Sequence, residues 1–342
     1  MKRPFPIIDA DGHVTESEEQ VRRYMPEPFR STRAHLRAGH NYWDINLGGT
    51  LGRTASDVDT WLKAMDDGGM ETSVLFPTSI GLTASLIWEP EVAVEVSRAY
   101  NQFMYEEFTG KSDRLKAVAL LPLQDLPTAV EELRRAVGEY GVVGAMLPAL
   151  GKHPPFGQKD YFPLYEEAQR LDVMLAVHSA TQGIHHLGAD DYQRFIEVNT
   201  YCFPVGLFKH LISMMFAGIP ELFPELRIGW MEGGCGWVPY WLERMDEKWE
   251  LRGKVEAPHL KRSPTEYARD GNWFFHTEAE EKMLPYVMSV VGDDKLFYAS
   301  DFPHWDSDYP NSIDEMLGRE DLSDDAKRKV MRENAMRLYG LT

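Results

Sequence analysis

An alternation of short apolar runs with amphipathic stretches is the feature that most constrains the fold of this chain. Apolar, β-branched runs recur along its 342 residues, and all but the last one or two are followed by a helical pattern. This order favours a closed (β/α)8 TIM barrel, an α/β fold, over an open sheet, and we predict one such domain over residues 1–342. The strands are expected at residues 6–11, 72–77, 115–122, 142–148, 173–179, 226–232, 273–277 and 296–301. The helices are expected at residues 57–68, 91–109, 127–139, 160–171, 204–217, 236–250 and 280–291, with a closing helix at 323–339.

Several helix ends carry recognisable signals. Asp125 stands where an N-cap is expected, two positions before a proline that suits a first helical turn. Gly69 and Gly141 follow helical runs, where left-handed C-caps are common, and Ser323 is the expected N-cap of the closing helix.

Three segments without a clear period are expected to be long loops between strands and helices, lying over the mouth of the barrel. Loops of this kind often carry binding residues and active-site lids. They are residues 26–56, 181–203 and 251–272.

Composition excludes several classes of function. The chain has 36 Lys and Arg against 54 Asp and Glu, a formal charge of −18 that opposes non-specific binding to nucleic acid or to an anionic membrane. We see no secretory signal and no apolar run long enough to span a bilayer, so a cytoplasmic protein is expected. The two cysteines, Cys202 and Cys235, have no CxxC spacing, which argues against a disulfide framework or a cysteine zinc site.

Polar residues cluster at the end of the first predicted strand. Because side chains alternate along a strand, Asp9, Asp11 and His13 are expected to point the same way. Oxygen and nitrogen ligands one residue apart on one face suit a divalent cation.

Three later strands also end in polar residues: His178, Glu232 and Asp301. Each alone has a structural explanation, since a buried histidine is more often a hydrogen-bonded core residue and either acid could cap a turn or helix. In a barrel, however, the carboxyl ends of the strands converge on one face. Buried carboxylates need a cation or hydrogen-bond donors, so the coincidence favours a site for Zn(II), Mn(II) or Fe(II).

The order of these motifs resembles the amidohydrolase superfamily, in its amidohydrolase-2 branch of aminocarboxymuconate-semialdehyde decarboxylase-like proteins. The matching segments span almost the whole chain and are Ile8–Val14, Ala176–His178, Phe223–Arg227, Glu232–Trp237 and Ala299–His304.

The resemblance implies one divalent metal ion, with zinc favoured and manganese as the alternative, held by Asp11, His13, His178 and Asp301. Two positions depart from the family pattern. Asp11 stands where the best-known members have His or Glu, and Glu232 stands where the family's decarboxylase has a catalytic His.

Further residues are candidates for the chemistry and for substrate binding. His304, three residues past Asp301, could carry a proton or support a ligand. Arg53 could clamp a substrate carboxylate, and His276 ends the seventh predicted strand, so both are candidate substrate-binding residues. Glu16 is expected to brace the loop after the first strand.

The first functional hypothesis, suggested by the resemblance, is non-oxidative decarboxylation of an aromatic or unsaturated carboxylic acid. Asp301 or Glu232 would deliver a proton to the carbon that bears the carboxylate. The alternative is hydrolysis of an amide, ester, lactone or thioacid by a metal-activated water, with Asp301 accepting the proton. A barrel that only binds is a third hypothesis, which predicts no stoichiometric metal. The expected partner is a small-molecule carboxylate substrate, with no nucleic acid or membrane, in a homodimer or homotetramer.

Overall fold

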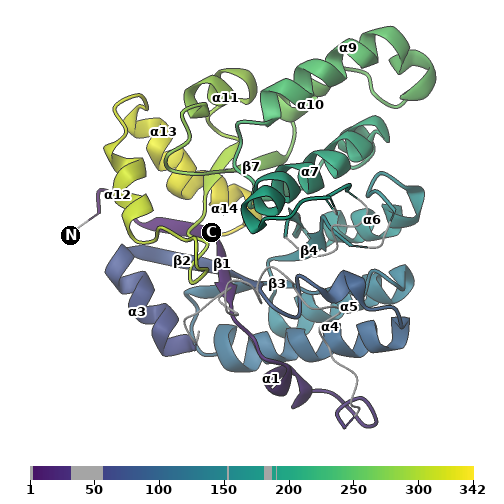
Figure 1. Cartoon of the computed structure of the whole chain (residues 1–342), viewed down its shortest axis with the longest axis vertical. Coiled ribbons are helices and arrows are strands. Elements are labelled where there is room, and N and C mark those ends of the chain that lie inside the picture. The colour runs from purple at the N-terminus through teal and green to yellow at the C-terminus, as the bar shows by residue number, and fades with distance from the viewer. Residues whose placement is uncertain (1–2, 32–56, 152–153, 181–186, 190) are drawn as a thin grey trace.

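Eight parallel strands form the centre of the molecule and are paired in the order β1 to β8. The structure is a computed structural model that describes residues 3–31, 57–151, 154–180, 187–189 and 191–342 (Figure 1). The predicted TIM-barrel fold is confirmed. The strands are β1 (Ile7–Val14), β2 (Met70–Pro77), β3 (Leu115–Ala119), β4 (Gly144–Pro148), β5 (Met174–His178), β6 (Ile228–Met231), β7 (Trp273–Thr277) and β8 (Leu296–Tyr298).

The barrel closes between β1 and the residues that follow β8. The His13 backbone N–H donates to the carbonyl of Phe302 at 2.7 Å, and the Asp301 N–H donates to the carbonyl of Asp11 at 3.0 Å. These bonds join the first and last strands at their carboxyl ends. Three residues of the predicted metal site, Asp11, His13 and Asp301, are therefore part of the seam of the barrel.

Helices form an outer layer around the strands, as Figure 1 shows. At the C-terminal end of the chain, the Tyr339 hydroxyl donates to the carbonyl of Ala10 at 2.6 Å and so ties the last helix to β1. The helices are α1 (Glu18–Arg22), α3 (Val58–Gly68), α4 (Pro90–Met104), α5 (Leu126–Tyr140), α6 (Phe162–Arg170), α7 (Phe195–Phe216), α8 (Ile219–Leu222), α9 (Val238–Glu256), α10 (Pro264–Asp270), α11 (Leu284–Val291), α12 (Asn311–Gly318), α13 (Asp324–Arg328) and α14 (Asn334–Tyr339).

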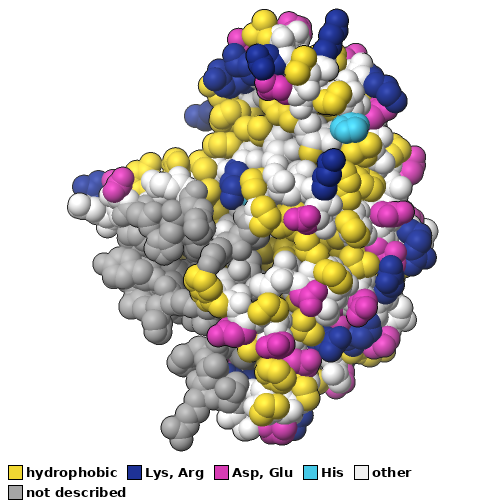
Figure 2. All heavy atoms as spheres, turned by 90° about the vertical axis from the view of Figure 1, so that its right-hand side faces the viewer, with side chains coloured by type: hydrophobic (Ala, Val, Ile, Leu, Met, Phe, Trp, Pro, Cys, Tyr) yellow, Lys and Arg dark blue, Asp and Glu magenta, His cyan; other side chains and the backbone are white. Residues whose placement is uncertain are grey.

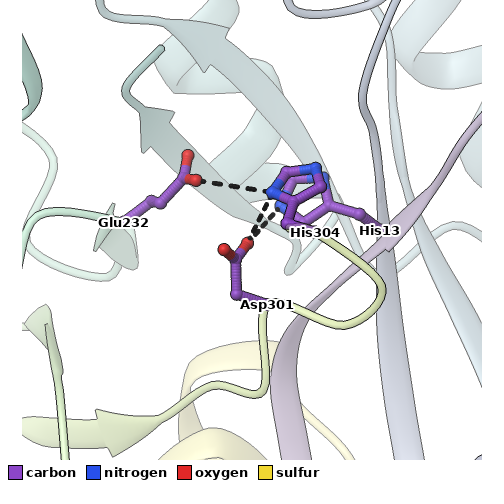
Figure 3. Close-up of side chains that lie close together, drawn as sticks. All are labelled: His13, Glu232, Asp301 and His304. Carbon is purple, nitrogen blue, oxygen red and sulfur yellow. Dashed lines mark ion pairs between the residues drawn. The ribbon is translucent and has the colours of Figure 1, made fainter. Parts of the chain in front are cut away.

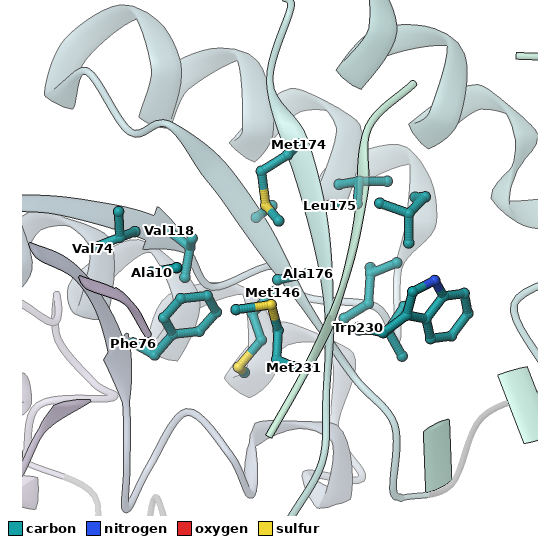
Figure 4. Packing of buried hydrophobic residues seen from close by; sticks show 14 of the residues in the cluster. Ala10, Val74, Phe76, Val118, Met146, Met174, Leu175, Ala176, Trp230 and Met231 are labelled. Atoms are coloured by element: carbon teal, nitrogen blue, oxygen red, sulfur yellow. The ribbon is translucent and has the colours of Figure 1, made fainter. Parts of the chain in front are cut away.

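Apolar side chains fill the barrel below the polar strand ends. Leu175, Ala176 and Val177 of β5 are all fully buried, which is the pattern of a strand covered on both faces. Figure 4 shows Met146 and Met231 packed beside Ala176 among the buried side chains. The interior is thus a packed core rather than a channel, and a site can form only at an end of the barrel.

The predicted helix signals are confirmed. The Asp125 side chain accepts a hydrogen bond from the Thr128 N–H at 3.3 Å at the start of α5. Gly69 and Gly141 are left-handed C-caps, with φ of 75° and 64°. Ser323 caps α13, although a π-helical turn at Lys329–Glu333 interrupts the closing helix before α14.

The predicted loop at residues 181–203 is wrong in its second half, because α7 begins at Phe195 rather than at residue 204. Pro204 suits a first helical turn and therefore indicated a helix start. In the structure Pro204 lies inside α7, and the Glu197 side chain accepts from the Arg194 backbone N–H at 2.8 Å at the true start.

The predicted loop at residues 251–272 is also wrong. Helix α9 continues to Glu256, α10 follows, and the segment then leads into β7. A helix-to-strand connection reaches the amino end of a strand, so this segment lies away from the carboxyl ends of the strands. Of the first predicted loop, residues 32–56 lie outside the described residues.

Charged side chains are mixed on the face shown in Figure 2, where Asp and Glu lie among Lys, Arg and apolar residues. The net charge of −18 is therefore not gathered into one acidic patch on this face. Among the described residues, no helix is both long enough and apolar enough to cross a membrane.

Candidate metal centre at the carboxyl ends of the strands

The first strand supplies two side chains to the centre, Asp11 and His13, whereas Asp9 is directed elsewhere. Asp9 pairs with Ser73 and Gly12 with Leu75, so β1 has one more residue than β2 between these pairs, and the expected alternation is interrupted. The Asp9 carboxylate instead accepts from the Ser73 hydroxyl at 2.6 Å and from the Ser300 N–H at 2.7 Å. Asp9 therefore joins β1, β2 and the end of β8, and the expectation that it points the same way as Asp11 and His13 is wrong.

The two histidines of the centre are oriented by backbone carbonyls. His13 Nδ1 lies 3.0 Å from the carbonyl oxygen of Pro77, and His178 Nδ1 lies 2.7 Å from that of Ser179. A carbonyl can only accept a hydrogen bond, so each Nδ1 carries a proton and each Nε2 is the ring atom left to bind an ion. Both Nε2 atoms face Asp11, at 3.5 Å for His13 and 3.3 Å for His178.

Two further acids stand on strained backbone beyond the ends of their strands. Glu232 follows β6 with φ of 51°, and Asp301 lies just beyond β8 with φ of 52°. Left-handed conformations of residues other than glycine cost about 1–3 kcal/mol and are found mainly at functional sites. Asp301 Oδ1 lies 3.1 Å from His13 Nε2, and Glu232 Oε2 lies 3.4 Å from His178 Nδ1.

His304 connects these two acids. Its Nδ1 lies 3.0 Å from Asp301 Oδ1 and 3.7 Å from Glu232 Oε1, and its Nε2 lies 3.1 Å from the hydroxyl of Thr78. The rings of His304 and His13 stack with their centroids 3.8 Å apart. Figure 3 shows the two acids directed toward this pair of rings.

Buried atoms without hydrogen-bond partners show what the centre lacks. Five atoms of the centre have no hydrogen-bond partner among the described residues: Asp11 Oδ1, His13 Nε2, His178 Nε2, Glu232 Oε2 and Asp301 Oδ1. A buried polar atom without a partner costs about 1–3 kcal/mol, so this convergence needs an explanation. Imidazole nitrogens and carboxylate oxygens are ligands of Zn(II), Mn(II) and Fe(II), and the residues fit one divalent cation.

The atoms that could ligate an ion fall into two overlapping groups, each spanning no more than 4.8 Å. One group is Asp11, His13 and His178, and the other is His13, Glu232, Asp301 and His304. His13 belongs to both. The structure thus brings three of the four predicted ligands into one group and places Asp301 in the adjoining one.

Charges in the centre are strongly coupled. Burial raises the pKa of the Asp301 carboxyl, but the His304 and His13 imidazoles outweigh it and hold that pKa well below its usual range. Burial, reinforced by the Asp301 carboxylate, raises the pKa of Glu232 to about 8. Burial lowers the pKa of His178, yet the neighbouring carboxylates outweigh it and raise that pKa to about 9. A cation bound at His178 would replace this proton, so metal binding would weaken as the pH falls.

The remaining predicted residues have different positions. His276 is buried at the end of β7, and Nδ1 lies 3.7 Å from Glu278 Oε1. Within the part of the chain that the structure describes, its two ring nitrogens have no hydrogen-bond partner. It belongs to neither ligand group. Arg53 lies outside the described residues. Glu16 was expected to brace the loop after β1, but its carboxylate accepts from the Thr78 N–H at 3.0 Å and so braces the chain after β2.

A pocket opens beside His304 and Glu232, with aromatic side chains on its wall. Its lining consists of Thr78, Leu82, Ala180, Phe195, Asn199, Phe203, Glu232, His304, Trp305 and Asp306. Sequence reasoning missed Thr78, Phe195, Trp305 and Asp306. The place of Trp305 and Asp306 directly after His304 was a usable signal, whereas Thr78 and Phe195 gave none.

Comparison with known proteins agrees with this architecture. The family model described as Amidohydrolase, of the amidohydrolase-2 branch, matches residues 8–341. Over 311 residues the chain is 28% identical to the gamma-resorcylate decarboxylase of Rhodococcus jostii, covering 88% of this chain and 91% of that protein.

Two solved structures have the same fold. An amidohydrolase from Mycobacterium avium subsp. paratuberculosis superposes with a TM-score of 0.81 at 20% identity, covering 100% of this chain and 99% of the other. A dihydroxybenzoic acid decarboxylase from Polaromonas, solved with bound manganese and 2-nitroresorcinol, superposes with a TM-score of 0.73 at 22% identity and covers 98% and 97%. The chain belongs to the amidohydrolase family, as its strand-end motifs and its barrel indicate.

Proposed function

We propose that this protein is a metal-dependent, non-oxidative decarboxylase of aromatic carboxylic acids. The observation that carries the proposal is the convergence, at the carboxyl ends of the strands, of five buried nitrogen and oxygen atoms that could bind a metal and have no hydrogen-bond partner among the described residues. The relationship to a gamma-resorcylate decarboxylase over most of both chains supports decarboxylation rather than another reaction of the family.

Asp11, His13, His178 and Asp301 are the residues proposed to hold the ion. When bound, a divalent cation would neutralise the crowded carboxylates and attract the carboxylate or hydroxyl oxygens of a substrate. We propose manganese rather than the zinc that was expected from the family resemblance. Carboxylate ligands suit manganese, and the Polaromonas decarboxylase contains it.

Glu232 is the proposed proton donor. Its Oε2 has no hydrogen-bond partner among the residues that the structure describes, and its side chain lines the pocket beside His304. The proton would form a bond to the ring carbon that bears the carboxylate. The bond between that carbon and the carboxylate then breaks, its electron pair returns to the ring, and carbon dioxide leaves. His304, whose Nδ1 lies 3.7 Å from Glu232 Oε1, is proposed to return a proton to the acid.

The wall of the pocket suits a planar ring. Phe195, Phe203 and Trp305 line it, and the rings of Phe195 and Trp305 lie edge to face with centroids 5.6 Å apart. Aromatic side chains offer large flat apolar surfaces to an aromatic substrate. We also propose that Arg53 and His276 bind polar groups of the substrate.

The proposal is tested with manganese-loaded protein and a panel of hydroxybenzoates that includes 2,6-dihydroxybenzoate, measuring carbon dioxide release. We expect turnover by the wild type and loss of both turnover and bound metal in His178→Ala. A panel of ester, amide and lactone substrates in ¹⁸O-labelled water tests the alternative. Incorporation of ¹⁸O into a product without release of carbon dioxide would replace decarboxylation by hydrolysis.

A further inference from the structure

We propose that Thr78 is a positioning residue that holds His304 in the orientation needed to serve the acids of the centre. The inference rests on the proposed decarboxylase function, in which His304 returns a proton to Glu232. It concerns the orientation of the ring and requires no particular protonation state of His304.

Thr78 itself is fixed by a buried acid. Glu16 is 3% exposed, and its carboxylate accepts from the backbone N–H groups of Thr78 at 3.0 Å, Ile80 at 2.5 Å and Gly81 at 3.1 Å. Three donors from one short segment leave that segment little freedom, because moving it would leave a buried carboxylate without partners. Glu16, just after β1, therefore fixes the position of the backbone that follows β2.

Two consecutive residues of this segment hold two rings of the centre. The Pro77 carbonyl accepts from His13 Nδ1 at 3.0 Å, and the Thr78 hydroxyl lies 3.1 Å from His304 Nε2. The two rings stack on each other. Pro77 and Thr78 thus direct His13 Nε2 toward the ligand group and His304 Nδ1 toward Asp301.

The hydroxyl is suited to this task because it can donate to a bare ring nitrogen or accept from a protonated one. It supports one ring orientation in either case. Thr78 is 3% exposed, and its hydroxyl has no hydrogen bond to any of the atoms proposed to hold the metal. Its loss should therefore affect the rate of proton movement rather than metal binding.

The test uses Thr78→Val, which keeps the shape and removes the hydroxyl, and Thr78→Ser, which keeps the hydroxyl. Thr83→Val is the matched control, because Thr83 is equally buried in the same segment but its hydroxyl donates only to the carbonyls of Ser79 and Ile80. We expect kcat of Thr78→Val to fall about 10- to 100-fold, the usual range for groups that orient a ligand or base. KM and metal content should stay within about twofold.

Thr78→Ser should restore most of the rate, and Thr83→Val should match the wild type. A Thr78→Val protein with wild-type kcat, or a Thr78→Ser protein as slow as Thr78→Val, would overturn the inference. Crystal structures of the metal-loaded variants separate it from the proposed function, because they need no substrate. Rotation of the His304 ring in Thr78→Val alone supports the positioning role even if no carboxylic acid is turned over, and an unmoved ring contradicts it.

Discussion

Two buried acidic regions of this barrel differ in how their charges are satisfied. Glu167 on α6 has a side chain only 6% exposed, and the guanidinium groups of Arg134 and Arg170 both donate to it, with Arg134 Nε at 2.7 Å. These hydrogen bonds, Arg170 first and Arg134 second, lower the pKa of Glu167 to about 2. Every charge in this group has a partner within the chain.

The acids at the strand ends have the opposite character. Asp11, Glu232 and Asp301 are surrounded by imidazoles, and each has a buried oxygen without a hydrogen-bond partner in the described part of the chain. The contrast teaches how to separate architecture from function in one molecule. A buried carboxylate with partners of its own supports the fold, whereas one that lacks them indicates a ligand.

The largest expected effect is on turnover. Asp301→Asn should lower kcat/KM by about 10²- to 10⁴-fold, because it removes a charge that both orients His304 and is proposed to ligate the ion. Glu167→Gln should leave kcat/KM unchanged. Steady-state kinetics of both variants with the same substrate measure the difference. Equal losses of kcat/KM would contradict the view that the strand-end acids serve function and Glu167 serves the fold.

The second effect is stabilisation by metal. Saturation at 100 to 1,000 times Kd should add about 3–4 kcal/mol to the free energy of unfolding, because the ion binds only the folded site. Denaturant unfolding with and without manganese measures this gain. Glu167→Gln should keep it and His178→Ala should lose it. A gain of equal size in His178→Ala would mean that the ion binds elsewhere.

The smallest effect is the pH dependence of stability at Glu167. The folded pKa of about 2 lies below the ordinary value of 4.5, so the ion pairs stabilise the fold fully above about pH 4.5. The contribution is lost as the pH falls from there toward about 2. We expect Glu167→Gln to cost about 1–2 kcal/mol at pH 7. In urea titrations its difference from the wild type should shrink by pH 3, and a constant difference would show that charge is not the cause.

Much of the centre could be predicted because a strand end is a local signal. Apolar runs that stop at His178, Glu232 and Asp301 identified positions that a barrel must bring to one face. The grouping of Asp11 and His13 with His178 agrees with that reasoning. By contrast, the role of Asp9 was not predictable, since it depends on an extra residue in β1 that only pairing with β2 reveals.

The sequence by itself determined the barrel, because the periodicity of its apolar residues indicates alternating buried strands and amphipathic helices. It also determined which side chains stand at the strand ends. Only the tertiary structure decided that Thr78 meets His304, 226 positions away, and that Phe195 and Trp305 form one wall. These contacts depend on strand register and on where a helix begins, which are settled by packing between distant segments rather than by neighbouring residues.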